Sequence, residues 1–455
     1  MSLVRKVDIR DEAGAAFSAA NPLPVEAGTN GVNVNLRDDS GTVFSAGNPL
    51  PVIAGTGGVN VNTDTSRAAF GEQLCAQLSP IIQLSFEYTV DNTHLIENTV
   101  ANTGTVTQSS AMAVIGTGGT TASTALLRSH RHAKYKVGLD GLTRFTAVFT
   151  SPVAGTVQII GLADEVGSST YFTNGFMIGY VGTTFGFHRF QNDVLTTVAL
   201  SAWDDPLDGT GTSGMTIDFT KLNVFQIQFQ YLGAGAINVY VESPTTGKFF
   251  IAHQIQYANL YTSPSVYNPN FHLIVFSGNG ATTSDIILKT ASCAYFVEGK
   301  TELIETQQPQ FCTGIKEKTT VTTEVAIVTI KNKSTYAGKN NFIDILLERF
   351  GCSIEASSAN NLGSIRLIKN ATLGGVPSYA DINTTDSVVS FDVAGTTVTG
   401  GENIISIPLA GKNDKWVENL VQYKIILGEG ETLTIAGLSA NSATIDASLL
   451  WKELF

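Results

Sequence analysis

The closest pair of histidines in the sequence is His130 and His132, with Arg128 and Arg131 as neighbours. If this segment forms a strand, residues two positions apart point to the same face, so both imidazoles would share one side. Such a face offers nitrogen ligands for a metal or a basic patch for an anion. A solvated strand edge or an interface patch is the simpler interpretation, and we predict no metal site here.

Three carboxylates lie close together at Asp204, Asp205 and Asp208, next to Gly209 and Gly211. Calcium ions prefer oxygen-rich loops of this kind, but the spacing differs from that of an EF-hand. Asp-Pro and Asp-Gly pairs are also common in turns. We therefore predict a structural turn, and the sequence leaves open whether these three carboxylates bind a cation.

Three aromatic residues, Phe187, Trp203 and Tyr257, are candidates for contact with a glycan. The hypothesis requires their rings to lie on the surface, where a ring can stack on a sugar. For Trp203, a position in the core or at its rim is the alternative interpretation.

Motifs with a known catalytic mechanism are missing from the sequence. It has no Gly-x-Ser-x-Gly elbow between a strand and a helix, no phosphate-binding loop and no His-Glu-x-x-His zinc motif. Carboxylates are plentiful, so a glycosidase pair stays open, but nothing singles out two of them. We predict a protein that is not an enzyme and that uses no cofactor.

The clearest pattern in the chain is a duplication near its start. A segment that begins at Ile9 recurs at Leu36, an offset of 36 − 9 = 27 residues without a gap. Each copy carries Asn-Pro-Leu-Pro-Val, whose prolines favour an extended segment that cannot donate to a central strand ladder. The residues predicted to anchor this arm are Phe17, Pro22, Leu23, Pro24, Val25, Phe44, Pro49, Leu50, Pro51 and Val52. Repeats this small cannot bury their apolar side chains alone, so we expect residues 1–65 to bind other protein chains.

Residues 66–127 are predicted to form a connector. Apolar residues of Arg67–Leu78 recur at helical spacing, and Pro80 would end that short helix. Ile82–Tyr88 alternates between apolar and polar residues and is predicted as a strand.

The remainder of the chain has the period-two pattern of strands. In Val224–Tyr231, apolar residues occupy every second position and glutamines fill most of the others, which is typical of an antiparallel sheet with one buried face. Short strands with glycine turns indicate sandwiches or jelly rolls. We predict an all-β protein, in which an extended N-terminal repeat arm is followed by two β-sandwich or jelly-roll-like domains, at 128–300 and 301–455. Within the second domain we expect a helical turn near Trp416–Leu420 and a strand at Tyr423–Leu427.

The composition limits the partners. Only 15% of the 455 residues are charged, against about 25% in an ordinary soluble domain. The net charge is −12, and phosphate-binding grooves need clustered lysine and arginine, so we predict no nucleic-acid partner. The start of the chain lacks the apolar region of a signal peptide, and no stretch is long enough to span a bilayer. We expect a soluble protein made in a cytosol, with its four cysteines reduced.

The Asn-Pro-Leu-Pro-Val copies resemble the N-terminal arms of tailed-phage structural proteins. Leu207–Gly211, Asn223–Tyr231 and Tyr257–Asn259 resemble a domain of fibre-like virion proteins from large phages and other large DNA viruses. Leu427–Ile435 and Leu450–Glu453 look like the last strands of small β-sandwiches in phage appendages. The sequence has no coiled-coil heptads and no triple-helical shaft repeat, so a long thin fibre is not expected.

This resemblance implies a structural virion protein, namely a head or tail fibre, a spike or a capsid decoration, assembled in the host cytoplasm as a homotrimer. Its partners would be other virion proteins of the capsid, neck or tail, and it would not insert into a membrane. The alternative is a virion adhesin that binds a host receptor or a host surface glycan. A polysaccharide depolymerase is a third hypothesis.

Overall fold

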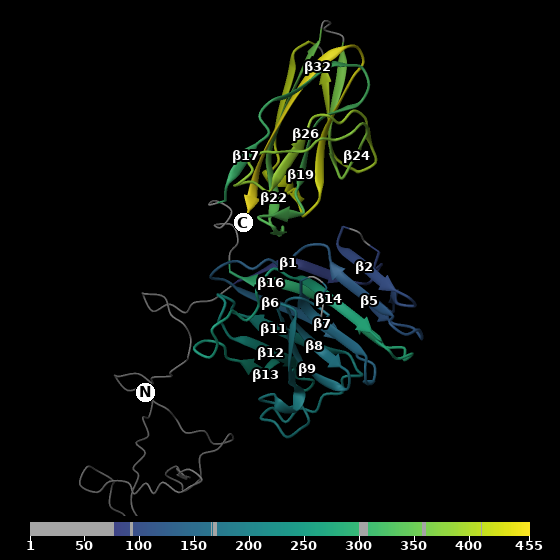
Figure 1. Ribbon diagram of the computed structural model, residues 1–455, viewed down its shortest axis with the longest axis vertical. Helices are drawn as coiled ribbons and strands as arrows, with labels where there is room; N and C mark the ends of the chain where they lie inside the picture. Colours follow the sequence, from purple (N-terminus) through teal and green to yellow (C-terminus); the bar gives the residue numbers. More distant parts are fainter. Residues whose placement is uncertain are drawn as a thin grey trace, which may run out of the picture. The chain divides into compact units, whose positions relative to one another are not determined.

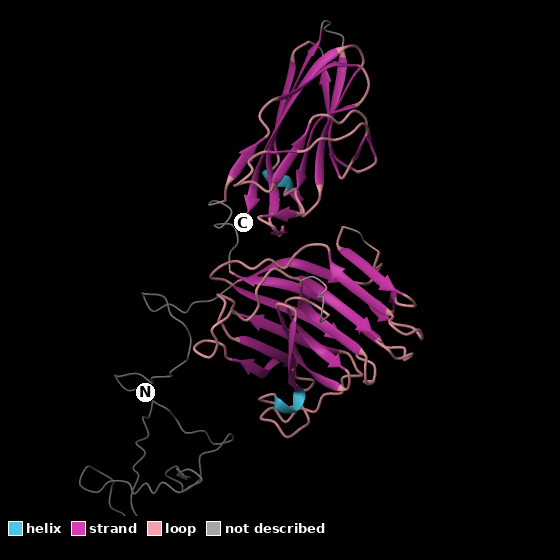
Figure 2. Ribbon diagram, viewed as in Figure 1, coloured by secondary structure: helices cyan, strands magenta, loops and turns pink. Residues whose placement is uncertain are grey.

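The computed structural model describes residues 77–91, 94–164, 166, 171–299, 308–356, 361–410 and 412–455. These residues form antiparallel sheets and two short 3-10 helices, so the predicted all-β class is confirmed (Figure 1, Figure 2). Residues 77–299 form a first sandwich and residues 308–455 form a second. The predicted anchoring arm, with its ten repeat residues, lies outside the described residues.

The strands of the first sandwich are short and are joined by turns and loops. They are β1 (Leu78–Ser85), β2 (Ile96–Ala101), β3 (Thr105–Ser109), β4 (Met112–Gly116), β5 (Thr124–Ser129), β6 (Asp140–Ala147), β7 (Val157–Ala163), β8 (Gly175–Val181), β9 (Thr184–Gln191), β10 (Val194–Ala199), β11 (Asn223–Phe229), β12 (Ile237–Glu242), β13 (Phe249–Ile255), β14 (His272–Gly278), β15 (Ile287–Thr290) and β16 (Ser292–Glu298).

In the described residues these strands form three antiparallel sheets. A six-stranded sheet has the order β1-β16-β6-β11-β12-β13, and a seven-stranded sheet has the order β10-β9-β8-β7-β14-β5-β2. The strands β15, β4 and β3 form a small third sheet. Because the first strand pairs with the last, β1 with β16, the two ends of this domain are held together.

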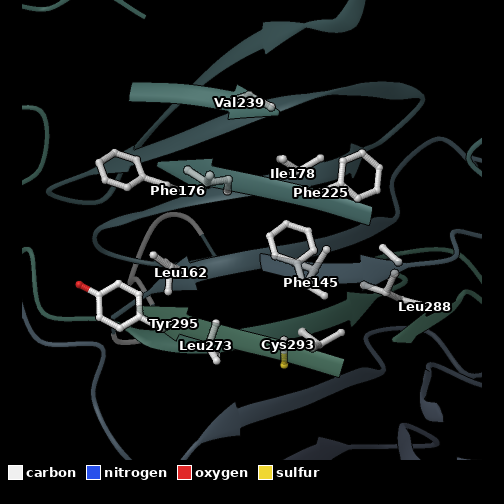
Figure 3. Close-up of a cluster of buried hydrophobic side chains, with 14 of the residues drawn as sticks. Phe145, Leu162, Phe176, Ile178, Phe225, Val239, Leu273, Leu288, Cys293 and Tyr295 are labelled. Atoms are coloured by element: carbon white, nitrogen blue, oxygen red, sulfur yellow. The ribbon is translucent and has the colours of Figure 1, made fainter. Parts of the chain in front are cut away.

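Aromatic and aliphatic side chains fill the core between the six-stranded and seven-stranded sheets (Figure 3). Phe225, Ile227 and Phe229 of β11 are buried, as their alternation with glutamine predicts. Phe229 reaches the facing sheet, where its ring centroid lies 5.3 Å from that of Phe176. Burial of one such ring stabilises the fold by roughly 2–3 kcal/mol. The packed core therefore gives the loops at the ends of the sheets a rigid support.

The connector predicted over residues 66–127 is corrected by the strand pairing. Its described part supplies β1 to the six-stranded sheet, and β2 and most of β5 to the seven-stranded sheet. The threonine-rich and glycine-rich segment Asn102–Thr124 contains the hairpin of β3 and β4, which pairing with β15 completes. Of the predicted helix Arg67–Leu78, the structure describes the last two residues, and Leu78 begins β1. Long-range pairing decides these elements, and local spacing does not reveal it.

The seven-stranded sheet requires glycine at one central point. Gly179 of β8 has a φ of +145°, and a Cβ atom there would lie 2.1 Å from the carbonyl oxygen of Gln158 in β7. On the other neighbouring strand, His188 lies with Nε2 3.0 Å from the Gly179 carbonyl oxygen and Nδ1 3.0 Å from the Thr197 hydroxyl. Burial lowers the pKa of His188 to about 4, so this imidazole is neutral at pH 7.

The second sandwich has longer central strands. Its strands are β17 (Gln310–Cys312), β18 (Lys316–Val321), β19 (Val325–Asn332), β20 (Thr335–Tyr336), β21 (Lys339–Asn340), β22 (Asp344–Ala356), β23 (Leu362–Lys369), β24 (Thr372–Leu373), β25 (Ala380–Asp381), β26 (Val389–Asp392), β27 (Val398–Thr399), β28 (Glu402–Ala410), β29 (Asp414–Asn419), β30 (Ile426–Leu427), β31 (Thr432–Ser439) and β32 (Ala443–Leu454).

Two main sheets face each other in the second sandwich. One has the order β17-β32-β22-β29, with β18 beside β32 and β30 beside β22, and the other has the order β25-β26-β19-β31-β23-β28. Their core includes Phe350, Leu367 and Trp451, all fully buried. The carboxylate of Glu453, also fully buried, accepts hydrogen bonds from the Ser387 hydroxyl at 2.5 Å and from the indole of Trp451 at 3.2 Å.

Two elements predicted in the second sandwich are displaced along the chain. A helical turn was expected near Trp416–Leu420, but Asp414–Asn419 form the edge strand β29, which pairs with β22, and a 3-10 turn follows at Val421–Tyr423. Trp416 and Leu420 are four positions apart, as on one face of a helix. The backbone of this segment nevertheless forms its hydrogen bonds with β22 and not within a helix. Tyr423–Leu427, predicted as a strand, starts at the end of a 3-10 turn at Val421–Tyr423 and pairs at Ile426–Leu427.

Cys293, Cys312 and Cys352 are free thiols in the structure. No helix among the described residues is long and apolar enough to cross a membrane.

Candidate functional site

Two exposed tyrosines mark one end of the seven-stranded sheet. Tyr261 and Tyr267 are 57% and 55% exposed, and both belong to the long segment between β13 and β14. The turn between β9 and β10 lies beside that segment. Gln191 donates to the carbonyl oxygen of Pro264, and the backbone N–H groups of Asn192 and Tyr267 share the side-chain oxygen of Asn174. We call this surface the tyrosine edge and define it by Gln191, Asn192, Tyr261 and Tyr267.

The ring of Tyr261 is held in a fixed orientation. It stacks on the buried ring of Tyr257 with the centroids 4.3 Å apart and 24° between the planes. The guanidinium of Arg189 lies 5.3 Å from the Tyr257 centroid and 5.9 Å from the Tyr261 centroid. Cation–π contacts of this kind stabilise the pair by roughly 0.5–1 kcal/mol. Tyr261 therefore presents one ring face to solvent without needing to be ordered by a ligand.

The backbone beneath the tyrosines is fixed by side chains of the sheet. Gln191 donates from Nε2 to the carbonyl oxygen of Pro264 at 2.5 Å, and Tyr231 donates its hydroxyl to the carbonyl oxygen of Val266 at 2.8 Å. The turn itself places Asn192 and Asp193 at φ +48° and +65°, as a two-residue hairpin turn requires.

A buried amide joins three loops below the tyrosine edge. The side-chain oxygen of Asn174 accepts the backbone N–H of Tyr267 at 2.8 Å and that of Asn192 at 3.2 Å. The side-chain nitrogen of Asn174 donates to the Asp164 carboxylate at 2.8 Å, and Asn268 donates to the same carboxylate at 3.4 Å. Asn174 and Asp164 are both buried, so these hydrogen bonds are strong and their loss is costly.

The chemistry of the tyrosine edge suits a ligand with apolar and hydroxyl surfaces. Exposed tyrosine rings give flat apolar area and a polar hydroxyl, at low cost in side-chain entropy. The exposed side chain of Asn192 lies in the adjoining turn, where it can add donors and an acceptor. The Gln191 amide nitrogen already donates to Ser263 and Pro264, so Gln191 can add only its side-chain oxygen as an acceptor. Binding loops placed on a rigid sheet are the usual arrangement for recognition.

The predicted glycan contacts are corrected by their burial. Phe187, Trp203 and Tyr257 are all buried, and none offers a ring face to a ligand at the surface. Phe187 belongs to the core face of β9, and the indole of Trp203 packs on Phe185 and donates to the Val198 carbonyl oxygen at 3.1 Å. Tyr257 supports the exposed ring of Tyr261 from below.

The carboxylates of Asp204, Asp205 and Asp208 are used inside the protein. Asp205 accepts the backbone N–H groups of Leu207 at 3.0 Å and Ser213 at 2.7 Å. Asp208 accepts from the backbone of Thr210, and Asp204 accepts from that of Gln254. The loop is thus a set of side-chain-capped turns. Across the described residues no group of three His, Cys, Asp or Glu side chains is arranged to hold a metal ion.

The histidine pair is also separated by the fold. Strand β5 ends at Ser129, so His130 and His132 do not share a strand face. His130 lies with Nδ1 2.8 Å from a carboxylate oxygen of Glu97, whereas the ring of His132 packs on that of His272 at 4.0 Å.

The carboxylate near His130 is held in its charged form. The hydrogen bond from His130, and a second from Arg128, lower the pKa of Glu97 to about 2 against the opposing effect of burial. Glu97, Arg128 and His130 line a cavity of about 800 Å³. Glu97 is thus ion-paired with both Arg128 and His130, so its carboxylate is already used inside the protein.

Sequence reasoning missed Tyr261, Tyr267 and Asn174. One available signal was the composition of Tyr257–Asn270, which is rich in tyrosine, serine, proline and asparagine. Such loops are typical of recognition surfaces. The three-way role of Asn174 has no local signal, since its partners are distant in sequence.

No family model matches the sequence, and no curated protein matches it. Several solved structures match 48% of the chain. One is peanut lectin with a nine-residue peptide, at 14% identity over 97% of that chain and a TM-score of 0.31. Another is the lectin UEA-II complexed with galactose, at 13% identity over 100% of that chain and a TM-score of 0.32. A glycosyl hydrolase family 16 protein from Mycobacterium smegmatis matches at 10% identity over 100% of that chain, with a TM-score of 0.31.

Proposed function

We propose that the first sandwich binds carbohydrate at the tyrosine edge. The observation that carries this proposal is the exposed ring of Tyr261, which is stacked on Tyr257 and held by Arg189 before any ligand arrives. A sugar ring has C–H groups on its faces and hydroxyls around its rim, so it needs an aromatic surface next to polar groups. The tyrosine edge supplies both, and its order reduces the entropy lost on binding.

A binding assay with one exposed tyrosine as the control tests this proposal. Full-length protein is applied to a glycan array as wild type, as Tyr261→Ala and as Tyr88→Ala. Tyr88 belongs to the same sandwich and is 94% exposed against 57% for Tyr261, so its removal takes away more exposed aromatic surface than the test variant does.

We expect Tyr261→Ala to weaken binding at least about tenfold, which corresponds to about 1.4 kcal/mol. Tyr88→Ala should leave binding unchanged. Absence of any bound glycan, or equal binding by wild type and Tyr261→Ala, would refute the proposal.

We further propose that the chain is a component of a virion, anchored by residues 1–65. The duplicated Asn-Pro-Leu-Pro-Val segment supports this second proposal, because two small repeats need a partner surface to bury their apolar residues. In this proposal the chain is an adhesin that presents the glycan site on the particle as a homotrimer.

Deletion of residues 1–65 separates the two proposals. The truncated protein should keep its glycan binding but fail to join particles. Normal incorporation of the truncated protein would show that the repeats are not the anchor. Incubation of a bound polysaccharide with the full chain should release no reducing ends, and their release would favour the depolymerase hypothesis.

A further inference from the structure

A second exposed aromatic cluster lies in the second sandwich, at the edge strand β29. Trp416 is 45% exposed, and Tyr423, in the 3-10 turn that follows, is 49% exposed. The carboxylate of Glu418 joins them, because Trp416 donates from Nε1 to Oε2 at 3.0 Å and Tyr423 donates its hydroxyl to Oε1 at 3.1 Å. We call these three residues the aromatic–carboxylate cluster.

The backbone around the cluster is fixed by the sheet. Strand β29 pairs with β22 along its full length, which sets the positions of Trp416 and Glu418. Leu420, between Glu418 and Tyr423, is fully buried, and its N–H donates to the carbonyl oxygen of Glu348 at 2.8 Å. Both exposed rings are therefore held at the surface by buried neighbours and by one shared carboxylate.

The cluster is electronegative. The faces of Trp and Tyr rings carry partial negative charge, and Glu418 adds a full charge. Among the described residues, no lysine or arginine forms an ion pair with Glu418. Lys415 precedes Trp416 on the strand and points to the opposite face of the sheet.

The hydrogen bonds within the cluster also limit what it can bind. Glu418 takes the indole N–H and the phenol O–H, so neither ring has its donor free for a ligand. What remains are two aromatic faces and the unused lone pairs of one carboxylate. These groups attract a positive charge, and the net charge of −12 on the chain adds to that attraction.

We propose that the aromatic–carboxylate cluster binds the ammonium group of an organic cation, such as choline or a methylated amine. Aromatic faces bind quaternary ammonium groups by cation–π attraction, and a nearby carboxylate strengthens it. A neutral sugar is the less suited ligand, since the cluster offers it no free donor. This site is separate from the tyrosine edge, and it does not depend on glycan binding there.

The test compares a cation with its neutral isostere. Choline and 3,3-dimethylbutan-1-ol have nearly the same shape, but only choline is charged. Both are titrated into full-length protein at constant ionic strength, with tryptophan fluorescence as the signal. Trp203 and Trp451 are 5% and 0% exposed, so a saturable change reports on Trp416.

We expect choline to bind at least about fivefold more tightly than the alcohol. That ratio corresponds to about 1 kcal/mol, the size of one exposed cation–π contact. Equal affinity for the two compounds would overturn the proposal. A lack of any saturable change with choline would overturn it as well.

Substitution of the carboxylate locates the site. Glu418→Gln should weaken choline binding about fivefold and leave binding of the alcohol unchanged, whereas Glu355→Gln, an exposed glutamate on the same sheet, should change neither. Should Glu418→Gln fail to fold, Trp416→Leu followed by ligand-observed NMR replaces it, and the loss of one aromatic face should again weaken choline binding about fivefold. Unchanged choline binding in a folded Glu418→Gln or Trp416→Leu variant would refute the assignment, as would preferential binding of a neutral oligosaccharide or a peptide at this cluster.

Discussion

Replacement of Asn174 tests whether one buried amide holds the tyrosine edge. Asn174→Ala removes the donor to Asp164 and the acceptor for the backbone N–H groups of Tyr267 and Asn192. Asn174→Asp has nearly the same shape and keeps an acceptor for both N–H groups. However, it places an oxygen where the amide nitrogen lies, 2.8 Å from a carboxylate oxygen of Asp164.

The size of the effect follows from these contacts. A net hydrogen bond stabilises a protein by about 1 kcal/mol, and a bond to a charged group by about 1.5–3 kcal/mol. We expect Asn174→Ala to lower the free energy of unfolding of the first sandwich by about 3 kcal/mol. Asn174→Asp should cost at least as much, although it keeps two of the three bonds, because two carboxylates would be buried in contact.

Urea denaturation of the full chain, followed by tryptophan fluorescence, measures these differences. Buried Trp203 reports on the first sandwich and buried Trp451 on the second, so only the transition of the first sandwich should shift. Asn238→Ala is the matched control, since Asn238 accepts one exposed hydrogen bond from Gln254, and we expect it to cost less than about 0.5 kcal/mol. Glycan binding measured on the same variants should weaken for both Asn174 changes and stay constant for the control.

Two results would refute this reasoning. If Asn174→Ala has the stability of wild type, the amide does not hold the three loops together. If Asn174→Asp is clearly more stable than Asn174→Ala, the contact with Asp164 is not the one described.

Three further predictions concern buried groups. Gly179→Ala should lower the free energy of unfolding by about 3 kcal/mol or more in thermal melts, because the positive φ strains an alanine and its Cβ would contact Gln158. Gly214→Ala, with open space around it, should cost about 1 kcal/mol. Equal effects of the two substitutions would contradict this explanation. Burial lowers the pKa of His188 to about 4, so the unfolded chain binds a proton first as the pH falls. Stability should therefore decrease from about pH 6.5 to pH 4. His188→Gln should reduce this slope without removing it, because burial also lowers the pKa of His132 and of His272; an unchanged slope would exclude His188 as a contributor. Glu453→Leu should lower the free energy of unfolding by about 3 kcal/mol or more in urea denaturation. The substitution leaves the Ser387 hydroxyl, the Val388 N–H and the Trp451 indole without an acceptor. Unchanged stability would show that these donors find other partners.

Much of the fold was predictable because strand periodicity is local. Phe225, Ile227 and Phe229 alternate with glutamines, and their burial follows directly. The pairing of β1 with β16 had no such signal, because partners in a sandwich are distant in sequence. For this reason residues 66–127 were predicted to form a connector, although their described part belongs to the sheets.

The candidate site was less predictable than the fold. Aromatic residues occur in the core and at the surface alike, so type alone did not distinguish buried Phe187 from exposed Tyr261. Exposure depends on which strand face and which loop a residue occupies, and that is fixed by the register of pairing. For Tyr257 the prediction identified the right segment but the supporting ring instead of the exposed one.

A crystal structure of the full-length protein with the glycan it binds most tightly would test the central claim most directly. We predict density for a sugar ring over the exposed face of Tyr261, with its hydroxyls near Gln191 and Asn192. A sugar bound elsewhere on the first sandwich, with Tyr261 left free, would contradict it.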